Sequence, residues 1–410
     1  MGDRGAEAER AALAAIDEVA LVESLRAFVR LPSITGTEGE SAAQAWIADR
    51  LAGLGCDVDH WAIDLPAVTA DPGFPGWEVP RQEAHGVVGT WGGGRPRLVL
   101  NGHVDVVPPG DLAQWTRGRP FEGRVDGGAV WGRGACDMKG GLVCALAAVG
   151  AVAAAGVPLR GSVAVHPVVG EEDGGLGTFA TLLRGHRGDA AVIVEPTGLA
   201  VVPANAGALT FRLRVRGRSA HASVREQGVD AIERFWPVWQ ALRDLETRRN
   251  RDPDPLFGPW RLPYALSIGT VHAGDWPSSV ADELVAEGRM GVALGEPVAD
   301  ARAALEAALA GHPVEVQWFG GQFASGGPAR DRTIADLVSA AHADVTGRRP
   351  ATWGGPYGSD LRLLDAAGIP TVQYGPGDVR QAHAPDEHVA IADLLTATRT
   401  LTTTLLRYAA

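Results

Sequence analysis

The sequence predicts an α/β protein in which a smaller α+β domain interrupts a larger one. In the first and last parts of the chain, short apolar runs alternate with helical patterns, as in an open α/β sheet. The middle of the chain has a different order of strands and helices, and 410 residues are too many for one simple core. We therefore expect a larger domain formed by residues 1–206 and 321–410, and an inserted domain formed by residues 207–320.

The elements of the larger domain follow from hydrophobic periodicity. Leu and Val recur at three- and four-residue spacing over residues 7–30, and residues 42–54 repeat the pattern, so both are predicted helices. Three buried strands are expected within residues 96–107, 162–169 and 190–194, and each runs into polar residues. Because ligands bind at the carboxyl ends of the strands in such sheets, these polar residues are expected to meet at one site.

Residues 140–159 are twenty uncharged residues, a length that could span a membrane. The stretch consists mostly of Ala, Gly and Val, and it directly follows a charged motif. We interpret it as a buried, closely packed helix.

The middle of the chain predicts a ferredoxin-like domain. It opens with a strand, Thr210-Phe-Arg-Leu-Arg-Val-Arg216, whose alternation indicates that one face of its sheet is exposed or packs on a partner. Further elements are expected in the order helix, strand, strand, helix and strand, at residues 228–248, 264–271, 284–292, 300–309 and 314–318. Gly320-Gly321 and residues 325–328 mark a hinge on the return side.

Composition excludes some partners. A net charge of −12 argues against nucleic acid, which binds basic surfaces. Three cysteines, Cys56, Cys136 and Cys144, form no even disulfide framework, and the first residues contain no apolar signal segment. We expect a cytoplasmic protein that binds neither nucleic acid nor a membrane.

Five short segments hold a concentration of His, Asp and Glu. They are Gly-His103-Val-Asp105, Gly-Arg133-Gly-Ala-Cys-Asp137-Met-Lys-Gly-Gly, Glu171-Glu172-Asp-Gly-Gly, Glu195-Pro-Thr and Ala-His383-Ala-Pro-Asp-Glu-His388. Together they provide the imidazoles and carboxylates that two divalent cations need, with one carboxylate left over as a base.

The first two segments offer a ligand pair and a bridge. His103 and Asp105 lie two residues apart at a strand end, so their side chains can face the same side. His103 is expected to bind a metal, and Asp105 to orient it through the other ring nitrogen. Asp137 begins a helix, where it could cap the helix or bridge two cations with its two oxygens. Cys136 is interpreted as a buried neighbour.

The doubled glutamate predicts a division of roles. Adjacent carboxylates at the end of a buried strand repel each other and lose hydration, and a nearby metal removes that penalty. Glu172 is expected to be a ligand and Glu171 the base, and the alternative is a solvated loop pair. Glu195 follows a buried strand and needs a partner unless it is exposed. His383 lies in a tight loop in which Glu387 and His388 are alternatives.

These five segments, in this order, resemble the dizinc amidohydrolase family that contains acetylornithine deacetylase, succinyl-diaminopimelate desuccinylase, aminoacylase and carboxypeptidase G. The resemblance implies a zinc-peptidase-like catalytic domain with an inserted lid and dimerisation domain. It also implies that one metal is held by His103, Asp137 and Glu195, and the other by Asp137, Glu172 and His383. Glu171 would be the general base and Asp105 the orienting residue. Zn²⁺ is the expected metal, and Co²⁺ and Mn²⁺ suit the same ligands.

The resemblance extends to the inserted domain. His221, in Gly217-Arg-Ser-Ala-His-Ala, resembles the lid histidine that reaches a neighbouring subunit's active site, which implies a homodimer through the lid; composition alone favours a structural role. Ser279 lies in a segment that resembles the substrate-contacting turn, although many members have Asn there. Arg289 resembles the carboxylate-binding Arg of the family.

The implied function is hydrolysis of the amide bond of an N-acyl amino acid, by a metal-bridging water with Glu171 as base. A dipeptidase or carboxypeptidase acting on a dipeptide-like substrate is one alternative. A catalytically silent metal-binding protein, or a homologue in a biosynthetic pathway, is another.

Overall fold

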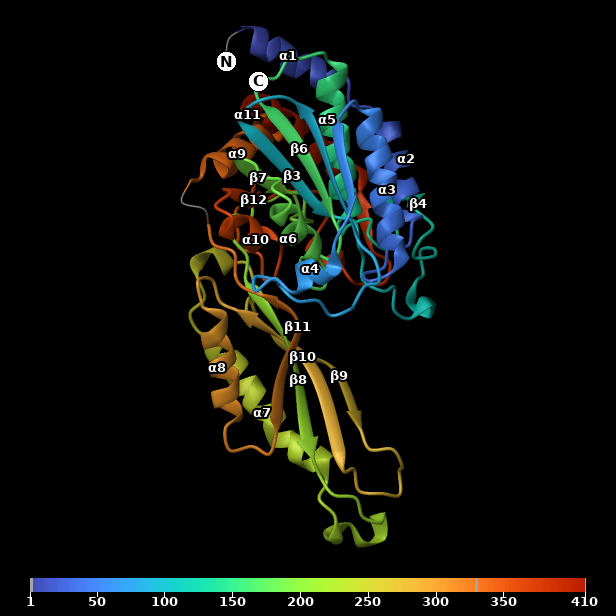
Figure 1. The fold of residues 1–410 in the computed structure, drawn as a ribbon, viewed down its shortest axis with the longest axis vertical. Coiled ribbons are helices and arrows are strands. Elements are labelled where there is room, and N and C mark those ends of the chain that lie inside the picture. Colours follow the sequence, from blue (N-terminus) through green and yellow to red (C-terminus); the bar gives the residue numbers. More distant parts are fainter. Residues whose placement is uncertain (1–2, 329–330, 410) are drawn as a thin grey trace.

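The computed structural model describes residues 3–328 and 331–409 (Figure 1). The larger domain is built on a six-stranded mixed sheet with strand order β1-β2-β6-β3-β7-β12. Its strands are β1 (Asp57–Ala62), β2 (His85–Gly92), β3 (Arg97–His103), β6 (Ser162–Val168), β7 (Ala190–Ile193) and β12 (Thr371–Gln373). β6, β3, β7 and β12 run parallel, and β2 runs antiparallel to both of its neighbours. The sequence predicted β3, β6 and β7 but not the antiparallel edge.

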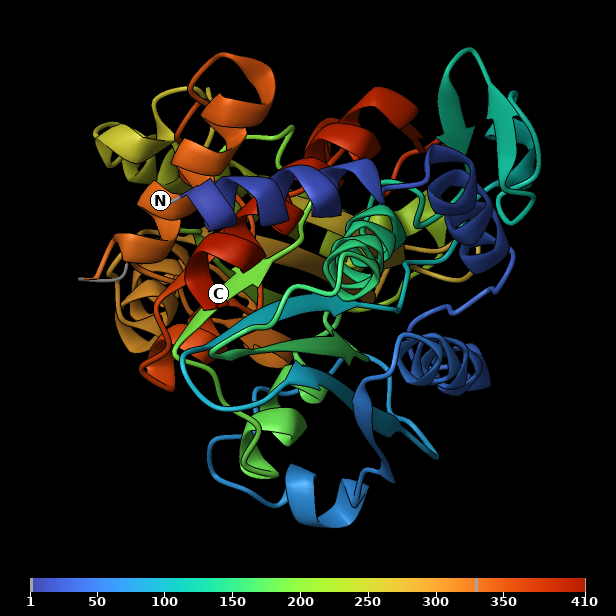
Figure 2. The same cartoon turned by 90° about the horizontal axis from the view of Figure 1, so that it is seen from above.

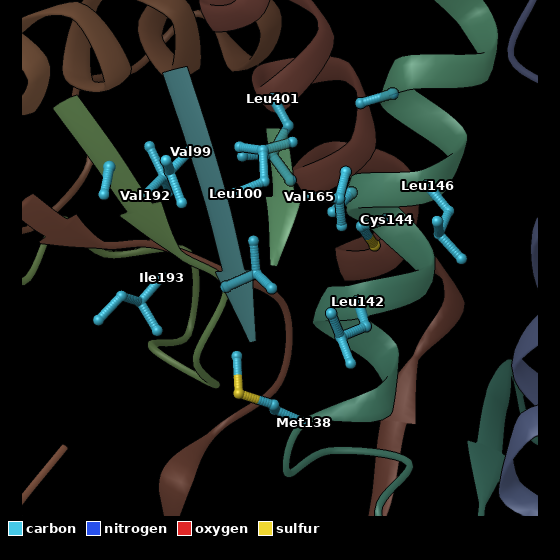
Figure 3. Packing of buried hydrophobic residues seen from close by; sticks show 14 of the residues in the cluster. Val99, Leu100, Met138, Leu142, Cys144, Leu146, Val165, Val192, Ile193 and Leu401 are labelled. Atoms are coloured by element: carbon cyan, nitrogen blue, oxygen red, sulfur yellow. The ribbon is translucent and has the colours of Figure 1, made fainter. Parts of the chain in front are cut away.

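Helices cover both faces of this sheet (Figure 2). α5 (Lys139–Ala154) and α11 (Ile391–Ala409) pack on each other and on β3, and α6 (Leu176–Leu183) packs on β6 and β2 from the other side. Leu100, Val165 and Leu142 belong to the same buried core, which includes the sheet and α5 (Figure 3). The prediction of a buried helix within residues 140–159 is confirmed, and none of the helices in the described ranges is long and apolar enough to cross a bilayer.

The prediction of one helix over residues 7–30 is wrong. The chain forms α1 (Asp3–Ala14) and α2 (Glu18–Val29), separated by a break at which Asp17 accepts a hydrogen bond from the backbone N–H of Ala20. An N-cap of this kind begins a new helix. The remaining elements of this domain are α3 (Glu38–Gly53), α4 (Leu65–Thr69), β4 (Arg124–Asp126), β5 (Ala129–Trp131), α9 (Thr333–Thr346), α10 (Leu361–Ala366) and β13 (His388–Ala390).

The inserted domain is ferredoxin-like, as predicted. Its elements are β8 (Gly207–Arg216), α7 (Ala231–Arg249), β9 (Leu266–Ala273), β10 (Glu283–Val292), α8 (Val298–Leu309) and β11 (Glu315–Phe323), and its antiparallel sheet has the order β11-β8-β10-β9. Leu209, Phe211 and Leu213 of β8 belong to its buried core, whereas Thr210 and Arg212 are half-buried on the opposite face. The domain extends away from the larger one (Figure 1).

The return to the larger domain lies within a strand. Gly320 and Gly321 occupy the irregular part of the pairing between β11 and β8, and the strand continues to Phe323.

Candidate metal centre and catalytic cleft

The centre of the parallel sheet brings three of the five segments together. β3 lies between β6 and β7, with His103 opposite Val168 of β6 and Asn101 opposite Ile193 of β7. His103 therefore ends β3 beside the loop that carries Glu171 and Glu172 after β6. Glu195 follows β7 on the other side.

Asp137 reaches this site because α5 begins very close to the end of β7. A Cβ atom at Gly141 would lie 1.9 Å from the carbonyl oxygen of Val194, so only glycine permits this approach. The peptide bond between Asp137 and Met138 is cis.

His383 comes from a loop near the C-terminus. Its backbone has φ 62°, a left-handed conformation that is uncommon for a residue other than glycine. The guanidinium of Arg133 donates hydrogen bonds to the carbonyl oxygens of His383 (3.3 Å) and Ala384 (3.2 Å). These contacts hold the loop over the site.

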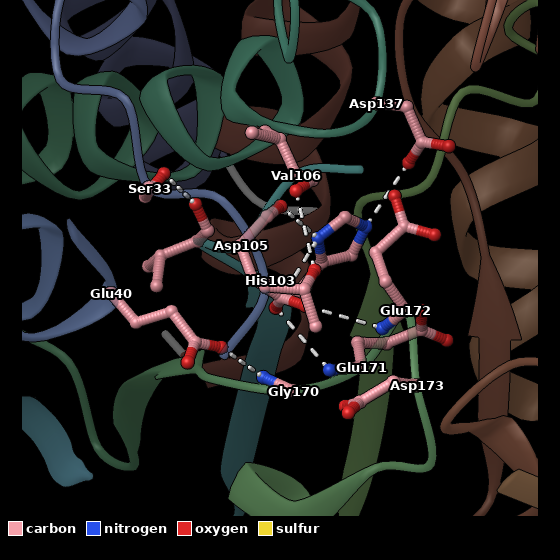
Figure 4. Close-up of polar contacts among 12 residues, drawn as sticks. Ser33, Glu40, His103, Asp105, Val106, Asp137, Gly170, Glu171, Glu172 and Asp173 are labelled. Carbon is pink, nitrogen blue, oxygen red and sulfur yellow. Dashed lines mark hydrogen bonds and ion pairs between the residues drawn. The ribbon is translucent and has the colours of Figure 1, made fainter. Parts of the chain in front are cut away.

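The two oxygens of Asp137 face two different imidazoles. Oδ1 lies 3.0 Å from Nε2 of His103, and Oδ2 lies 3.5 Å from Nε2 of His383. Glu172 lies on the His383 side, with Oε2 3.0 Å from the same Nε2. Figure 4 shows His103 and Glu172 turned towards Asp137.

The donor atoms are close enough for metal binding. One atom each from His103, Glu171 and Glu195 lie within 4.8 Å of one another, and so do one each from His103, Asp137 and Glu172. Imidazole nitrogens and carboxylate oxygens are the ligands that Zn²⁺ and similar divalent ions take in catalytic sites. Both groups share His103, and His383 contacts Asp137 and Glu172 on the other side, so the residues together fit a pair of divalent cations.

Several pKa values of the cluster are raised, which shows that its carboxylates attract protons or other cations. Burial raises the pKa of Glu171 well above its ordinary value and that of Glu195 to about 8. The Glu172 carboxylate raises the pKa of His383 to about 11. Burial disfavours the imidazolium of His103, but hydrogen bonding and charge from Asp137 outweigh burial and raise its pKa. Without cations, the cluster retains protons instead.

Glu171 and Glu172 point differently. Glu172 contacts His383, whereas Glu171 is buried and lines the cleft, and its Oε1 has no hydrogen-bond partner among the described residues. A buried acceptor left unpaired is costly in a folded protein, so this oxygen is a candidate to receive a proton from a bound molecule.

The carboxylate of Asp105 makes its closest contacts with the following loop and with Thr35, and not with the ring of His103. Its carboxylate accepts hydrogen bonds from the backbone N–H groups of Glu171 (3.2 Å) and Glu172 (3.3 Å) and from the hydroxyl of Thr35 (3.0 Å). The nearer partner of His103 Nδ1 is the backbone carbonyl oxygen of Asp105 at 2.9 Å, and the carboxylate lies 3.7 Å away.

Glu387, which the sequence offered only as an alternative to His383, is fully buried behind Asp137. It accepts hydrogen bonds from the backbone N–H groups of Cys136 and Asp137, both at 3.0 Å, and pairs with Arg133 at 2.5 Å. His388 instead stacks on Trp131, with ring centroids 4.0 Å apart. The local sequence could not show that Glu387 binds the backbone near Asp137 while His388 stacks on Trp131, because these partners lie far away in the chain.

A cleft of about 600 Å³ connects the cluster to the inserted domain. Its lining includes Glu171 and Glu172 on one side, and the exposed sheet face of the inserted domain on the other. The residues from that face include Thr210, Ser267, Thr270, Glu287 and Arg289. Tyr357, which sequence reasoning did not single out, also lines the cleft and donates a hydrogen bond from its hydroxyl to Gln373 (3.1 Å).

Arg289 differs from the other arginines on this sheet face. Arg212, Arg214 and Arg216 each form an ion pair with a glutamate, namely Glu287, Glu283 and Glu315 respectively. Arg289 has no hydrogen bond or ion pair with any described residue, although Glu78 lies near enough to influence its charge. An unpaired guanidinium in a cleft is suited to binding a carboxylate.

His221 and Ser279 do not line this cleft. They face each other in an isolated β-bridge, and Nδ1 of His221 lies 2.8 Å from the hydroxyl of Ser223. The segment that follows His221, yellow-green in Figure 1, lies at the end of the inserted domain farthest from the larger domain.

Comparison with known proteins now decides the family. The model of peptidase family M20/M25/M40 matches residues 99–407. The chain belongs to this family. It is therefore a metallo-hydrolase of a family that acts on amide bonds, and one solved member is described as a dinuclear metal-binding peptidase.

Two relatives cover nearly the whole chain. Succinyl-diaminopimelate desuccinylase of Methylorubrum extorquens (strain PA1) is 34% identical over 393 residues, covering 90% of this chain and 94% of the relative. N-formyl-4-amino-5-aminomethyl-2-methylpyrimidine deformylase of Halalkalibacterium halodurans is 29% identical over 427 residues, covering 94% and 92%.

Solved structures of the M20 family share the fold. The dipeptidase Dug1p of Saccharomyces cerevisiae superposes with a TM-score of 0.77 at 14% identity, and human carnosine dipeptidase 1 with 0.76 at 16%. In both comparisons 98% of each chain is covered.

Metal binding is expected to release protons near neutral pH. In the metal-free protein His103 and His383 hold protons, because their pKa values are raised, and a metal ligand must be deprotonated. Affinity for Zn²⁺ should therefore rise with pH between about 6 and 8, with at least one proton released per ion. Titration calorimetry in buffers of different ionisation enthalpy measures this release. His383→Gln should reduce this proton release, and His388→Gln, at the start of β13, should leave it unchanged. A heat of binding that does not vary with the buffer would contradict the expectation.

Proposed function

We propose that the protein is a dizinc hydrolase that removes the acyl group from a small N-acyl amino acid. The observation that carries this proposal is the arrangement of Asp137 between His103 and His383, with the buried Glu171 carboxylate beside it in the cleft. The names of the two relatives, a desuccinylase and a deformylase, support removal of an acyl group from nitrogen.

The residues have separate parts in this reaction. His103, Asp137 and Glu195 would hold one cation, and Asp137, Glu172 and His383 the other. Cations bound there would supply a water of lowered pKa and polarise the scissile carbonyl. Glu171 would take a proton from that water and later give it to the leaving amine.

Arg289 is proposed to bind the carboxylate of the substrate. It lies on the sheet face of the inserted domain that lines the cleft. Its neighbouring arginines on that face are neutralised by glutamates, so Arg289 is the guanidinium best placed to attract an anion.

We also propose a homodimer formed through the inserted domain, in which His221 reaches the cleft of the partner subunit. The segment Ala222–Gln227, which directly follows His221, lies at the far end of this domain, and this suits a contribution to a second copy rather than to its own cleft. Ile232 and Trp236 are exposed, Trp236 to 76%, on the outer side of α7. Exposed apolar residues of this kind are common where proteins associate. Ser279, paired with His221, would enter the same contact.

The alternatives are a dipeptidase or carboxypeptidase of the same family, and a catalytically silent metal-binding or biosynthetic-pathway homologue. The dipeptidase structures are too distant in sequence to favour a peptide substrate. The presence of Glu171 beside His103, Asp137, Glu172 and Glu195 at metal-binding distances argues against a silent protein. The three cysteines are free thiols, which supports the reducing cytoplasm as the location.

Replacement of the base tests the proposal most directly. Zinc content is measured first, and amine release from a panel of N-acyl amino acids and dipeptides is then followed with ninhydrin. Glu171→Gln should keep both zinc ions and lose at least ~100-fold in turnover, the usual weight of general-base catalysis. Full zinc without turnover on any substrate would favour the silent alternative. A variant with wild-type turnover would remove Glu171 from the role of base.

Arg289→Met should weaken binding of the substrate carboxylate. Loss of one charge-assisted hydrogen bond, worth about 1.5–3 kcal/mol, should lower kcat/KM by roughly 10- to 100-fold. Arg214→Met, on the same sheet face but paired with Glu283, is the matched control and should change it little. A substrate whose carboxylate is blocked as an amide should show no further loss in Arg289→Met. An equal loss with both substrates would exclude the proposed contact.

His221→Ala should lose activity without losing zinc. Mixing His221→Ala with Glu171→Gln subunits should restore activity, because one cleft of the mixed dimer then receives both side chains. Sedimentation velocity establishes whether the dimer forms. Unchanged kinetics in His221→Ala would return this residue to a structural role.

A further inference from the structure

A buried arginine lies directly behind the loop that carries Glu171 and Glu172. Arg81 precedes β2, and its side chain is 1% exposed. Its guanidinium contacts Glu40 at 2.7 and 3.0 Å and Asp173 at 3.0 Å through two nitrogens. The side chains of Glu40 and Asp173 are 2% and 5% exposed, so all three charges are removed from water.

This network holds the loop by its backbone. Glu40 accepts a hydrogen bond from the N–H of Gly170 at 3.0 Å, and Asp105 accepts those of Glu171 and Glu172 (Figure 4). Asp173, the next residue, is bound by Arg81. Four successive residues, 170–173, are therefore anchored through buried carboxylates.

Arg81 is the cation that keeps this arrangement together. Among the described residues it is the ion-pair partner of both Glu40 and Asp173. Two buried carboxylates without it would repel each other and lose their compensating charge. Lysine keeps the charge but cannot form two-pronged contacts with two carboxylates at once.

The same network touches the inserted domain. Asp173 accepts hydrogen bonds from the backbone N–H groups of Glu78 (3.2 Å) and Val79 (3.0 Å). The carboxylate of Glu78 in turn accepts one from the hydroxyl of Thr210 in β8, at 2.7 Å. A Cβ atom at Gly174 would lie 2.0 Å from the carbonyl oxygen of Gly76, so the loop and residues 76–81 are in close backbone contact. A shift of residues 76–81 would therefore move the loop as well.

We propose that Arg81 is a positioning residue for the reaction: through Glu40 and Asp173 it sets where Glu171 and Glu172 stand relative to the rest of the cluster. This inference rests on the proposed function for the roles of those two glutamates. Arg81 itself does not line the cleft, so it acts through the loop and not on the substrate.

The test compares Arg81→Lys with Arg184→Lys. Arg184 also makes two short contacts to one carboxylate, at 2.7 and 2.9 Å to Asp59, but on the surface. Both variants and the wild type are prepared with Zn²⁺ for kinetics and with Co²⁺ for absorption spectra, and metal content is measured for each. The Co²⁺ bands report the geometry of the ligands, which a change in overall stability would not alter.

Arg81→Lys should bind two metal ions, lose at least ~10-fold in kcat with KM nearly unchanged, and show shifted Co²⁺ bands, because small misplacements of catalytic groups are costly. Arg184→Lys should match the wild type in all three. Wild-type kcat and bands in Arg81→Lys would overturn the proposal, and so would a loss explained entirely by a smaller folded fraction.

If Arg81→Lys does not fold, Asp173→Asn is measured in the same way, and wild-type values there would overturn the proposal. Failure of the proposed function and failure of the positioning role of Arg81 give different results. A wild-type protein that releases no amine from any substrate contradicts the proposed function, whereas the Co²⁺ spectra still report whether Arg81 positions the loop.

Discussion

Buried carboxylates that bind backbone amides hold the candidate metal centre together. Glu387 binds the N–H groups around Asp137, Asp105 binds those of Glu171 and Glu172, and Glu40 binds that of Gly170. Each carboxylate holds a segment of backbone in place, so that the side chains of that segment remain free to form the metal centre. Charge burial is costly, and two of these carboxylates have a buried cation as partner: Glu387 pairs with Arg133 and Glu40 with Arg81. The cluster in front is then left acidic and suited to metal ions.

The inserted domain lines the other side of the cleft with a sheet face on which both arginines and glutamates are present. Its helices bury one face of its sheet, and the other face presents arginines and glutamates that neutralise each other in pairs. Among the described residues Arg289 has no such partner, and it lines the cleft. In the proposed function, the larger domain provides the chemistry and the inserted domain binds the charged end of the substrate.

Much of this could be predicted because strand ends are marked in the sequence. His103, Glu171 and Glu195 each follow an apolar run, and parallel strands bring such ends to one edge of the sheet. The alternation in β8 likewise predicted a sheet with one open face. The helix over residues 7–30 was wrong because periodicity continued across a break that the N-cap at Asp17 creates. The antiparallel edge formed by β1 and β2 gave too weak a pattern to be recognised.

The sequence by itself determined the kind of chemistry, since residue types and their order indicate imidazole and carboxylate ligands and a carboxylate base. Only the tertiary structure decided which carboxylates face the cleft and which bind the backbone. Glu387 and His388 are neighbours with different surroundings, and the partner of Glu387, Asp137, lies 250 residues away. Arg81 and Asp173 are separated by 92 residues. Hydrogen bonds between such distant segments depend on packing, so local sequence cannot specify them.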